Sequence, residues 1–235
     1  MISKEMNKNL SINGGIREAF NEARRQKALY GDENEYDLSI GNPSAPVPRK
    51  VTEVLKDFCG KKELDHQYMC ESGYEEVREK IADHLNQKYN TGYGNNNIIM
   101  TNGVAGGINI VLRALLNPGD EVIIFRPYYP AYKGFVENWQ GKIVEVNPKE
   151  DFQPDFEDLE HKITIRTKVV IVNSPHNPTG VIYTKETAAK ISEILKSKQK
   201  EYGHAICLLS DEPYRDLVYI EEKLPWWPDF YRNTI

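Results

Sequence analysis

The segment KVVIVNSPHNPTG, residues 168–180, joins an apolar run rich in β-branched residues to a loop that two prolines constrain. An apolar run of this length, bounded by asparagine and proline, predicts a buried strand at 168–173. Four similar runs occur elsewhere in the chain, at 97–101, 121–125, 142–146 and 205–210. Helical patterns accompany them at 104–116, 131–139, 155–161 and 185–202. This alternation predicts an α/β fold of three layers, with a mostly parallel sheet and helices on both of its faces.

The sequence before this alternation predicts two more helices, at 49–58 and 74–89. The segment GNPSAPVP at 41–48 contains too many prolines for a helix or a strand, so it is a natural boundary. We therefore expect an N-terminal arm with the start of a small domain at 1–45, and one large domain at 46–235.

Composition excludes several classes of function. The chain has 235 residues, 40% of them hydrophobic, and a formal net charge of −5, which leaves no basic surplus for a nucleic acid or an anionic membrane. Residues 1–30 are polar and charged, and no stretch is apolar enough to span a bilayer, so we expect a cytoplasmic protein. The three cysteines, Cys59, Cys70 and Cys207, favour free thiols and no metal site.

The candidate functional residues follow the strands, at the edge where parallel sheets bind ligands. TNGVAGG, residues 101–107, leads from a strand into a helix and would leave the N–H groups of Gly103, Val104 and Ala105 unpaired at its positive end. A glycine after a strand is by itself more often a tight turn. RPYYPAY, residues 126–132, places aromatic rings where one could lie on a planar ligand, although packing is their commoner role.

Two other strand ends carry more specific patterns. Asn177 in SPHNPTG presents an amide that can donate to a ligand oxygen, and this motif after a buried strand is seldom only a turn. Asp211 in DEPYRDLVY stands at the end of an apolar strand, where an unpaired carboxylate is costly. We therefore expect a cationic or hydrogen-bond-donating partner for Asp211. Tyr214 follows it at a fixed offset.

Taken together, TNGVAGG, PYYPAY, NSPHNPTG and SDEPYRDLVY resemble, in order and approximate spacing, the cofactor-binding signatures of class I and II aminotransferases. GNPSAPVP and QYMCESGYEEVREKIA, residues 67–82, also resemble segments of this family, so the resemblance covers nearly the whole chain. It implies the large domain of a fold-type I enzyme that uses pyridoxal 5′-phosphate.

The resemblance gives a catalytic role to three residues, Asp211, Tyr214 and Tyr129. Asp211 would pair with the pyridine nitrogen of the cofactor and keep it protonated, so that the ring can accept electrons. Asn177 and Tyr214 would hydrogen-bond the phenolic oxygen. Tyr129 would stack on the ring.

Other matching positions would hold the phosphate and the substrate. Gly103, Val104 and Ala105 would bind the cofactor phosphate. Tyr68 matches a tyrosine that reaches the phosphate of the neighbouring subunit, and Gly41 matches a glycine whose backbone amide meets the substrate carboxylate. A homodimer with shared active sites is therefore implied.

The family's chemistry also needs a lysine that binds the cofactor covalently and moves a proton. In the family it lies in a Ser-x-Ser-Lys-like segment roughly thirty residues beyond the aspartate. Lys223 is the only lysine after Asp211, and its polar surroundings indicate a surface charge. We expect the chain to end before the catalytic lysine, to bind cofactor weakly at best, and not to turn over alone.

These features predict a parent enzyme that moves an amino group from an amino acid to a 2-oxo acid. A lyase or synthase on the same scaffold is an alternative, because elimination and ring closure begin from the same carbanion. A non-catalytic binding module with this fold is another. A nicotinamide-dependent dehydrogenase fits poorly, since no G-x-G-x-x-G follows a predicted strand.

Overall fold

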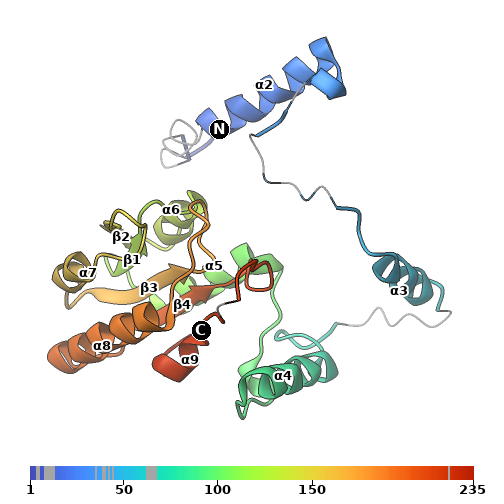
Figure 1. Ribbon diagram of the computed structural model, residues 1–235. Helices are drawn as coiled ribbons and strands as arrows, with labels where there is room; N and C mark the ends of the chain where they lie inside the picture. The colour runs from blue at the N-terminus through green and yellow to red at the C-terminus, as the bar shows by residue number, and fades with distance from the viewer. Residues whose placement is uncertain are drawn as a thin grey trace. The chain divides into compact units, whose positions relative to one another are not determined.

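The computed structural model describes residues 1–3, 6–7, 14–34, 36–38, 41, 43, 45–61, 68–221 and 223–235. They belong to two compact units, Met1–Tyr68 and Met69–Ile235 (Figure 1). The expected division into residues 1–45 and 46–235 stays a prediction.

The described residues of the first unit include the α-helices α2 (Gly14–Tyr30) and α3 (Arg49–Cys59) and a short 3-10 helix, η1 (Asp32–Asn34). The pattern at 49–58 predicted α3 to within one residue, whereas α2 was not predicted. The described residues at 41–48 form neither helix nor strand, as their prolines require.

The second unit is built on a parallel sheet of four strands: β1 (Glu121–Phe125), β2 (Lys142–Val146), β3 (Thr167–Asn173) and β4 (Cys207–Asp211). Their order in the sheet is β2-β1-β3-β4. All five residues of β1 and six of the seven in β3 are buried, which explains why these segments read as continuous apolar runs.

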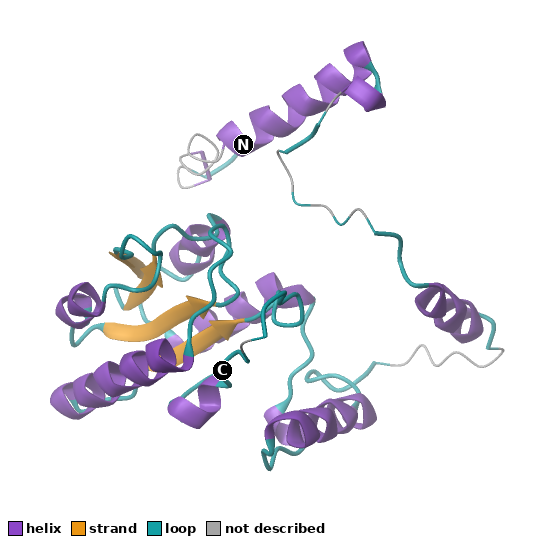
Figure 2. Ribbon diagram, viewed as in Figure 1, coloured by secondary structure: helices purple, strands orange, loops and turns teal. Residues whose placement is uncertain are grey.

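Helices cover both faces of the sheet, so the predicted three-layer α/β fold is confirmed (Figure 2). One face packs α7 (Phe156–Lys162), α8 (Lys185–Tyr202) and α9 (Trp227–Phe230) against side chains such as Ile123 and Val172. The other face packs α5 (Gly103–Leu115) and α6 (Ala131–Glu137) against Val122 and Ile171. Neighbouring residues of one strand thus enter different cores, because successive side chains of a strand point to opposite faces.

The prediction of a strand at 97–101 is wrong. Residues Asn95–Asn97 form a 3-10 helix, η2, and the following residues are extended but lie in no sheet. Met100 donates its N–H to the carbonyl of Ser72, which belongs to a turn, and its side chain and that of Ile99 are exposed. An apolar run becomes a strand only where a neighbouring strand can pair with it, and the described residues provide none here.

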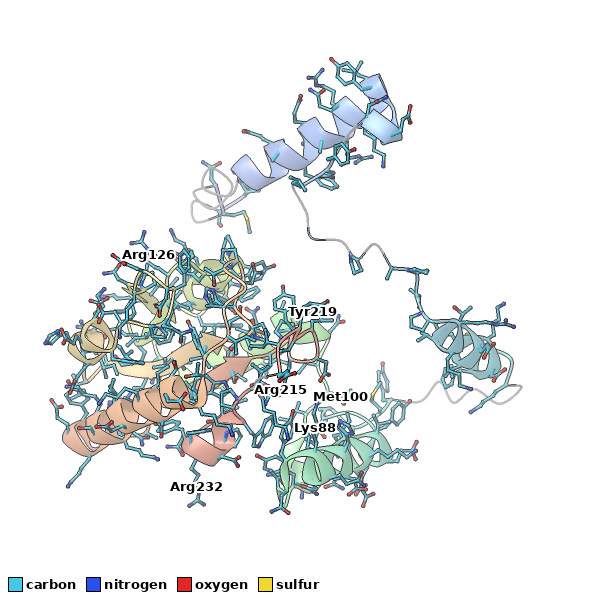
Figure 3. All side chains as sticks on the ribbon, viewed as in Figure 1. Lys88, Met100, Arg126, Arg215, Tyr219 and Arg232 are labelled. Carbon is cyan, nitrogen blue, oxygen red and sulfur yellow. The ribbon has the colours of Figure 1, made fainter. Side chains whose placement is uncertain are left out.

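The last turn of helix α4 (Glu75–Tyr89) packs against the segment that follows β4. The ring of Tyr89 stacks on Trp226 with centroids 4.0 Å apart, and Nε of Arg215 donates to the Tyr89 hydroxyl at 2.7 Å. Lys88 forms an ion pair of 3.0 Å with Asp216. Figure 3 labels Lys88 and Arg215 at this contact, where α4 meets the segment that follows β4.

Candidate active site

A cavity of about 260 Å³ lies at the carboxyl ends of the strands in the second unit. The chain runs from β1 to β2 on one side and then returns to β3 on the other side of β1, so the winding of the sheet reverses there. Open α/β sheets bind ligands at such a position. Six of the predicted site residues line this cavity, namely Val104, Ala105, Tyr129, Asn177, Asp211 and Tyr214.

Asp211 is the last residue of β4, and only 7% of its surface is exposed. Its Oδ2 accepts a hydrogen bond from the hydroxyl of Tyr132, which is the donor that the sequence led us to expect for this carboxylate. Its Oδ1 is buried and has no partner among the residues that the structure describes. Burial raises the pKa of Asp211, while the hydrogen bond from Tyr132 lowers it.

Tyr132 was not predicted as a site residue, although the motif PYYPAY contains it. It lies in the first turn of α6 and is almost fully buried. Its ring meets the ring of Tyr129 edge to face, with centroids 5.7 Å apart. The usable signal was the motif itself, because a turn joins the two tyrosines: the N–H of Tyr132 donates to the carbonyl of Tyr129 at 3.1 Å.

Asn173 is a second residue that sequence reasoning missed. It ends β3, its side chain is buried, and its Nδ2 donates to the backbone carbonyl of Asp211 at 2.8 Å. Its Oδ1 accepts the N–H of Asn177 at 2.7 Å. One amide side chain therefore connects the end of β4 to the loop that carries Asn177.

Asn177 and Tyr214 come from different loops and meet at the cavity. Nδ2 of Asn177 lies 3.4 Å from the hydroxyl of Tyr214, to which it donates. Both side chains are partly exposed, and each retains a donor that a ligand oxygen can accept: an amide proton on Asn177 and the phenolic proton on Tyr214. The two loops thus present two donors side by side.

The N-terminus of α5 forms another wall of the cavity. Gly103 has φ +72, a conformation that favours glycine, and its N–H donates to the carbonyl of Thr101 at 2.9 Å. The prediction that this N–H is unpaired is therefore wrong. Val104 and Ala105 line the cavity, and their N–H groups precede any helical carbonyl to which they could donate. An anion near these two amides would meet the positive end of the helix.

Three predicted positions do not line the cavity. Gly103 adjoins it through Val104. Gly41 and Tyr68 belong to the unit Met1–Tyr68, where both are exposed. The roles of Gly41 and Tyr68 stay predictions.

Lysine is missing from the residues that line the cavity in the described chain. Lys223 borders a different hollow, beside Trp226 and Arg215, and is exposed there. Among the residues that the structure describes, no group of three or more His, Cys, Asp or Glu side chains could hold a metal ion. No helix in this described part combines the length and the apolar character needed to cross a membrane.

Comparison with known proteins identifies the family. The sequence model of the family "Aminotransferase class I and II" matches residues 33–229. The chain therefore belongs to the class I and II aminotransferases.

Individual relatives agree with this assignment. The chain is 38% identical over 207 residues to the aspartate aminotransferase of Sulfolobus acidocaldarius, covering 83% of this chain and 49% of that protein. It superposes on the crystal structure of an aminotransferase from Eubacterium rectale with a TM-score of 0.94 and 39% identity, covering 100% of this chain and 60% of the other. An alanine aminotransferase from Pyrococcus furiosus gives a TM-score of 0.79 and 31% identity, covering 96% and 55%. The chain spans about half the length of the curated relatives it matches.

Members of this family depend on pyridoxal 5′-phosphate, and the cavity fits that group. Within the described part of the chain, the buried Oδ1 of Asp211 lacks a partner, which a protonated ring nitrogen would provide. The donors of Asn177 and Tyr214 and the first amides of α5 suit the oxygens of the same molecule.

Proposed function

We propose that this chain supplies the cofactor site of an aminotransferase that moves an amino group from an amino acid to a 2-oxo acid. The observation that carries the proposal is the buried carboxylate of Asp211 at the cavity. Tyr132 holds one of its oxygens, and no residue that the structure describes pairs with the other. A buried anion of this kind is stabilised by a cationic N–H donor, and a protonated pyridine ring is one.

Bound pyridoxal 5′-phosphate supplies a ring that takes up electrons from the α-carbon of the amino acid while its ring nitrogen is protonated. In the proposal, Asp211 holds that proton at the nitrogen. Asn177 and Tyr214 orient the ring by donating to its phenolic oxygen. Tyr129, whose side chain is 44% exposed, covers one face of the ring.

The remaining assignments concern the phosphate and the substrate. Val104 and Ala105 bind the phosphate through their backbone amides, and Gly103 gives the backbone the turn that aims them. In a homodimer, Tyr68 reaches the phosphate of the neighbouring subunit, and Gly41 offers its amide to the substrate carboxylate. The resemblance of the segments at 41–48 and 67–82 to family segments supports these two roles. A cytoplasmic location stays a prediction.

We further propose that the 235-residue chain binds the cofactor without a covalent bond and does not turn over by itself. The support is the lack of a lysine among the residues that line the described cavity.

Binding of pyridoxamine 5′-phosphate to the purified chain tests the cofactor site. We expect saturable binding, measured by calorimetry or ligand fluorescence, and about tenfold weaker binding to Asp211→Asn because a charge-assisted hydrogen bond is lost. Asp83→Asn is the matched control, since Asp83 lies exposed on α4 and away from the cavity. Equal affinities of wild type and Asp211→Asn, or no saturable binding, would contradict the proposal.

Reductive trapping tests the absence of a covalent bond. The chain is incubated with pyridoxal 5′-phosphate, treated with borohydride and digested, and labelled lysines are mapped by mass spectrometry. We expect only slow labelling of exposed lysines, equal in wild type and Asp211→Asn. One lysine labelled rapidly in wild type and not in Asp211→Asn would show that a lysine does reach the site.

The reaction itself is tested on the protein as the cell makes it. Because relatives of this chain carry the names aspartate and alanine aminotransferase, both amino acids serve as donors, with 2-oxoglutarate as acceptor. We expect glutamate and the oxo acid of the donor in equal amounts. Release of ammonia without glutamate would favour the lyase alternative.

A further inference from the structure

Tyr132 contacts the carboxylate of Asp211, on which the proposed function rests. It enters the cavity from α6, and its hydroxyl donates to Oδ2 of Asp211. Burial raises the pKa of Tyr132 far above its usual value, and the charge of Asp211 raises it further. The hydroxyl therefore keeps its proton at neutral pH, where it acts as a neutral donor.

The surroundings of Asp211 contain few other groups that could control its charge. Helix α5 contributes only apolar side chains to the cavity, such as Ile108. The nearby titratable groups are the hydroxyls of Tyr129 and Tyr214 and the carboxyl of Glu212. Glu212 is occupied elsewhere, since it accepts hydrogen bonds from Ser210 and Arg215. Among the described residues, Tyr132 makes the one hydrogen bond that the structure gives to the side chain of Asp211.

A neutral donor has a particular effect on a buried carboxylate. It stabilises the ionised form without neutralising its charge, so the demand for a cationic partner remains. It also occupies one oxygen and fixes the rotation of the group, which leaves Oδ1 as the acceptor for a ligand.

We infer that Tyr132 is a positioning residue that keeps Asp211 ionised and oriented, and that it thereby makes the cavity select ligands with a protonated ring nitrogen. This inference rests on the proposed function for its choice of ligand. The Tyr132 contact itself can be tested without any ligand.

Tyr128, four residues before Tyr132 in the loop that leads into α6, provides a matched control. Its hydroxyl also donates to a carboxylate, Oε1 of Glu145 at 2.6 Å, and it also loses one hydroxyl on mutation to phenylalanine. It does not line the cavity of Asp211. Tyr132→Phe and Tyr128→Phe therefore differ in which carboxylate loses its donor.

The first experiment follows the carboxyl carbon of Asp211 by NMR in the ligand-free chain labelled with ¹³C-aspartate, with Asp211→Asn identifying the signal. We expect Asp211 to titrate at a higher pH in Tyr132→Phe than in wild type, because the hydrogen bond that lowers its pKa is gone. In Tyr128→Phe the midpoint should not move. Equal midpoints in wild type and Tyr132→Phe would overturn the inference.

The second experiment measures how strongly the cavity prefers a ligand with a ring nitrogen. Affinities are compared for pyridoxamine 5′-phosphate and for its analogue with carbon in place of the ring nitrogen, at pH 6 to 8. We expect the preference for the nitrogen compound to fall about tenfold in Tyr132→Phe and to stay unchanged in Tyr128→Phe. In an Asp211→Asn background, Tyr132→Phe should have no further effect on the preference. An unchanged preference in Tyr132→Phe, or an equal fall in Tyr128→Phe, would overturn the inference.

The two experiments distinguish a failure of the proposed function from a failure of the inference about Tyr132. If the wild-type chain binds neither compound, the proposed function fails, and the NMR midpoints still decide whether Tyr132 controls the charge of Asp211. Near-ultraviolet circular dichroism of each variant checks that the aromatic side chains remain packed.

Discussion

At the scale of single residues, the carboxylate of Asp211 is poorly solvated in the ligand-free chain. The carboxylate of Asp211 is buried, burial raises its pKa, and one of its oxygens has no partner among the residues described by the structure. An ionised group in this state lowers the free energy of unfolding until a ligand pairs with it. Residues that bind a ligand often carry such a cost, because the arrangement that suits the ligand does not suit the empty site.

Asp211→Asn should therefore stabilise the ligand-free chain at neutral pH. The pKa of Asp211 in the folded chain is raised above its usual value of 3.8. The contribution of Asp211 to the free energy of unfolding is therefore fully present below pH 3.8 and is lost as the pH rises through the pKa of the folded chain. We expect a gain of about 1–3 kcal/mol at pH 7 in urea unfolding, shrinking as pH falls toward 3.8. Asp83→Asn should give no comparable gain. A less stable Asp211→Asn at pH 7 would contradict this account.

Sequence reasoning found Asp211, Asn177 and Tyr214 but not the residues that hold them. Tyr132 and Asn173 make short contacts across elements that are far apart in the chain, with sequence separations of 79 for Tyr132 and 38 for Asn173 to Asp211. Such contacts depend on the order of strands in the sheet, and no local pattern in the sequence encodes that order.

At the scale of elements, two of the three glycines near the start of helix α5, Gly103 and Gly106, have opposite requirements. Gly103 has φ +72, and a Cβ at this position would meet no atom within 4 Å. Gly106 has no such conformation, and a Cβ there would lie 3.8 Å from its nearest neighbour, Asn102 Cβ. Gly103 is therefore needed for its backbone conformation, whereas neither the backbone conformation nor the packing requires a glycine at position 106.

Gly103→Ala should lower the free energy of unfolding by about 1–2 kcal/mol, because an L-residue is strained in the left-handed region. Gly106→Ala should leave the stability unchanged or raise it by up to about 1 kcal/mol, since alanine is the better helix former. Urea unfolding of both variants checks this pair. If the two substitutions have equal effects, the conformation assigned to Gly103 is wrong.

Most strands and helices were predicted from the sequence, and the exceptions include the segment at 97–101 and helix α2. Four of the five predicted strands and all six predicted helices occur close to their expected bounds, because burial on both faces leaves a strong local pattern. The predicted strand at 97–101 failed, since pairing depends on a neighbour that local sequence does not specify. Helix α2 was not predicted, although Ile16, Phe20 and Ala23 recur at helical spacing in its sequence.

At the scale of the whole molecule, the three thiols report whether the α/β unit is assembled. Cys59 and Cys70 are exposed, and the hydrogen bonds to Ser72 lower the pKa of Cys70. Cys207 lies in β4, where burial raises the pKa of its thiol to about 12. We expect two thiols to react quickly with Ellman's reagent at pH 8 and the third only after unfolding in urea. Three fast thiols in the native chain would show that β4 is not covered.

The class of fold and the chemistry expected at the strand ends follow from the amino-acid sequence alone. Apolar runs, helical periodicity and short motifs such as NSPHNPTG depend only on neighbours along the chain, so they can be read without coordinates. The folded structure adds that Tyr132 holds one oxygen of Asp211 while the other has no partner in the described part of the chain, and that Asn173 connects two strand ends. These features arise when parallel strands bring distant residues to one edge of a sheet, and burial there, which sets the charge of Asp211, exists only after folding.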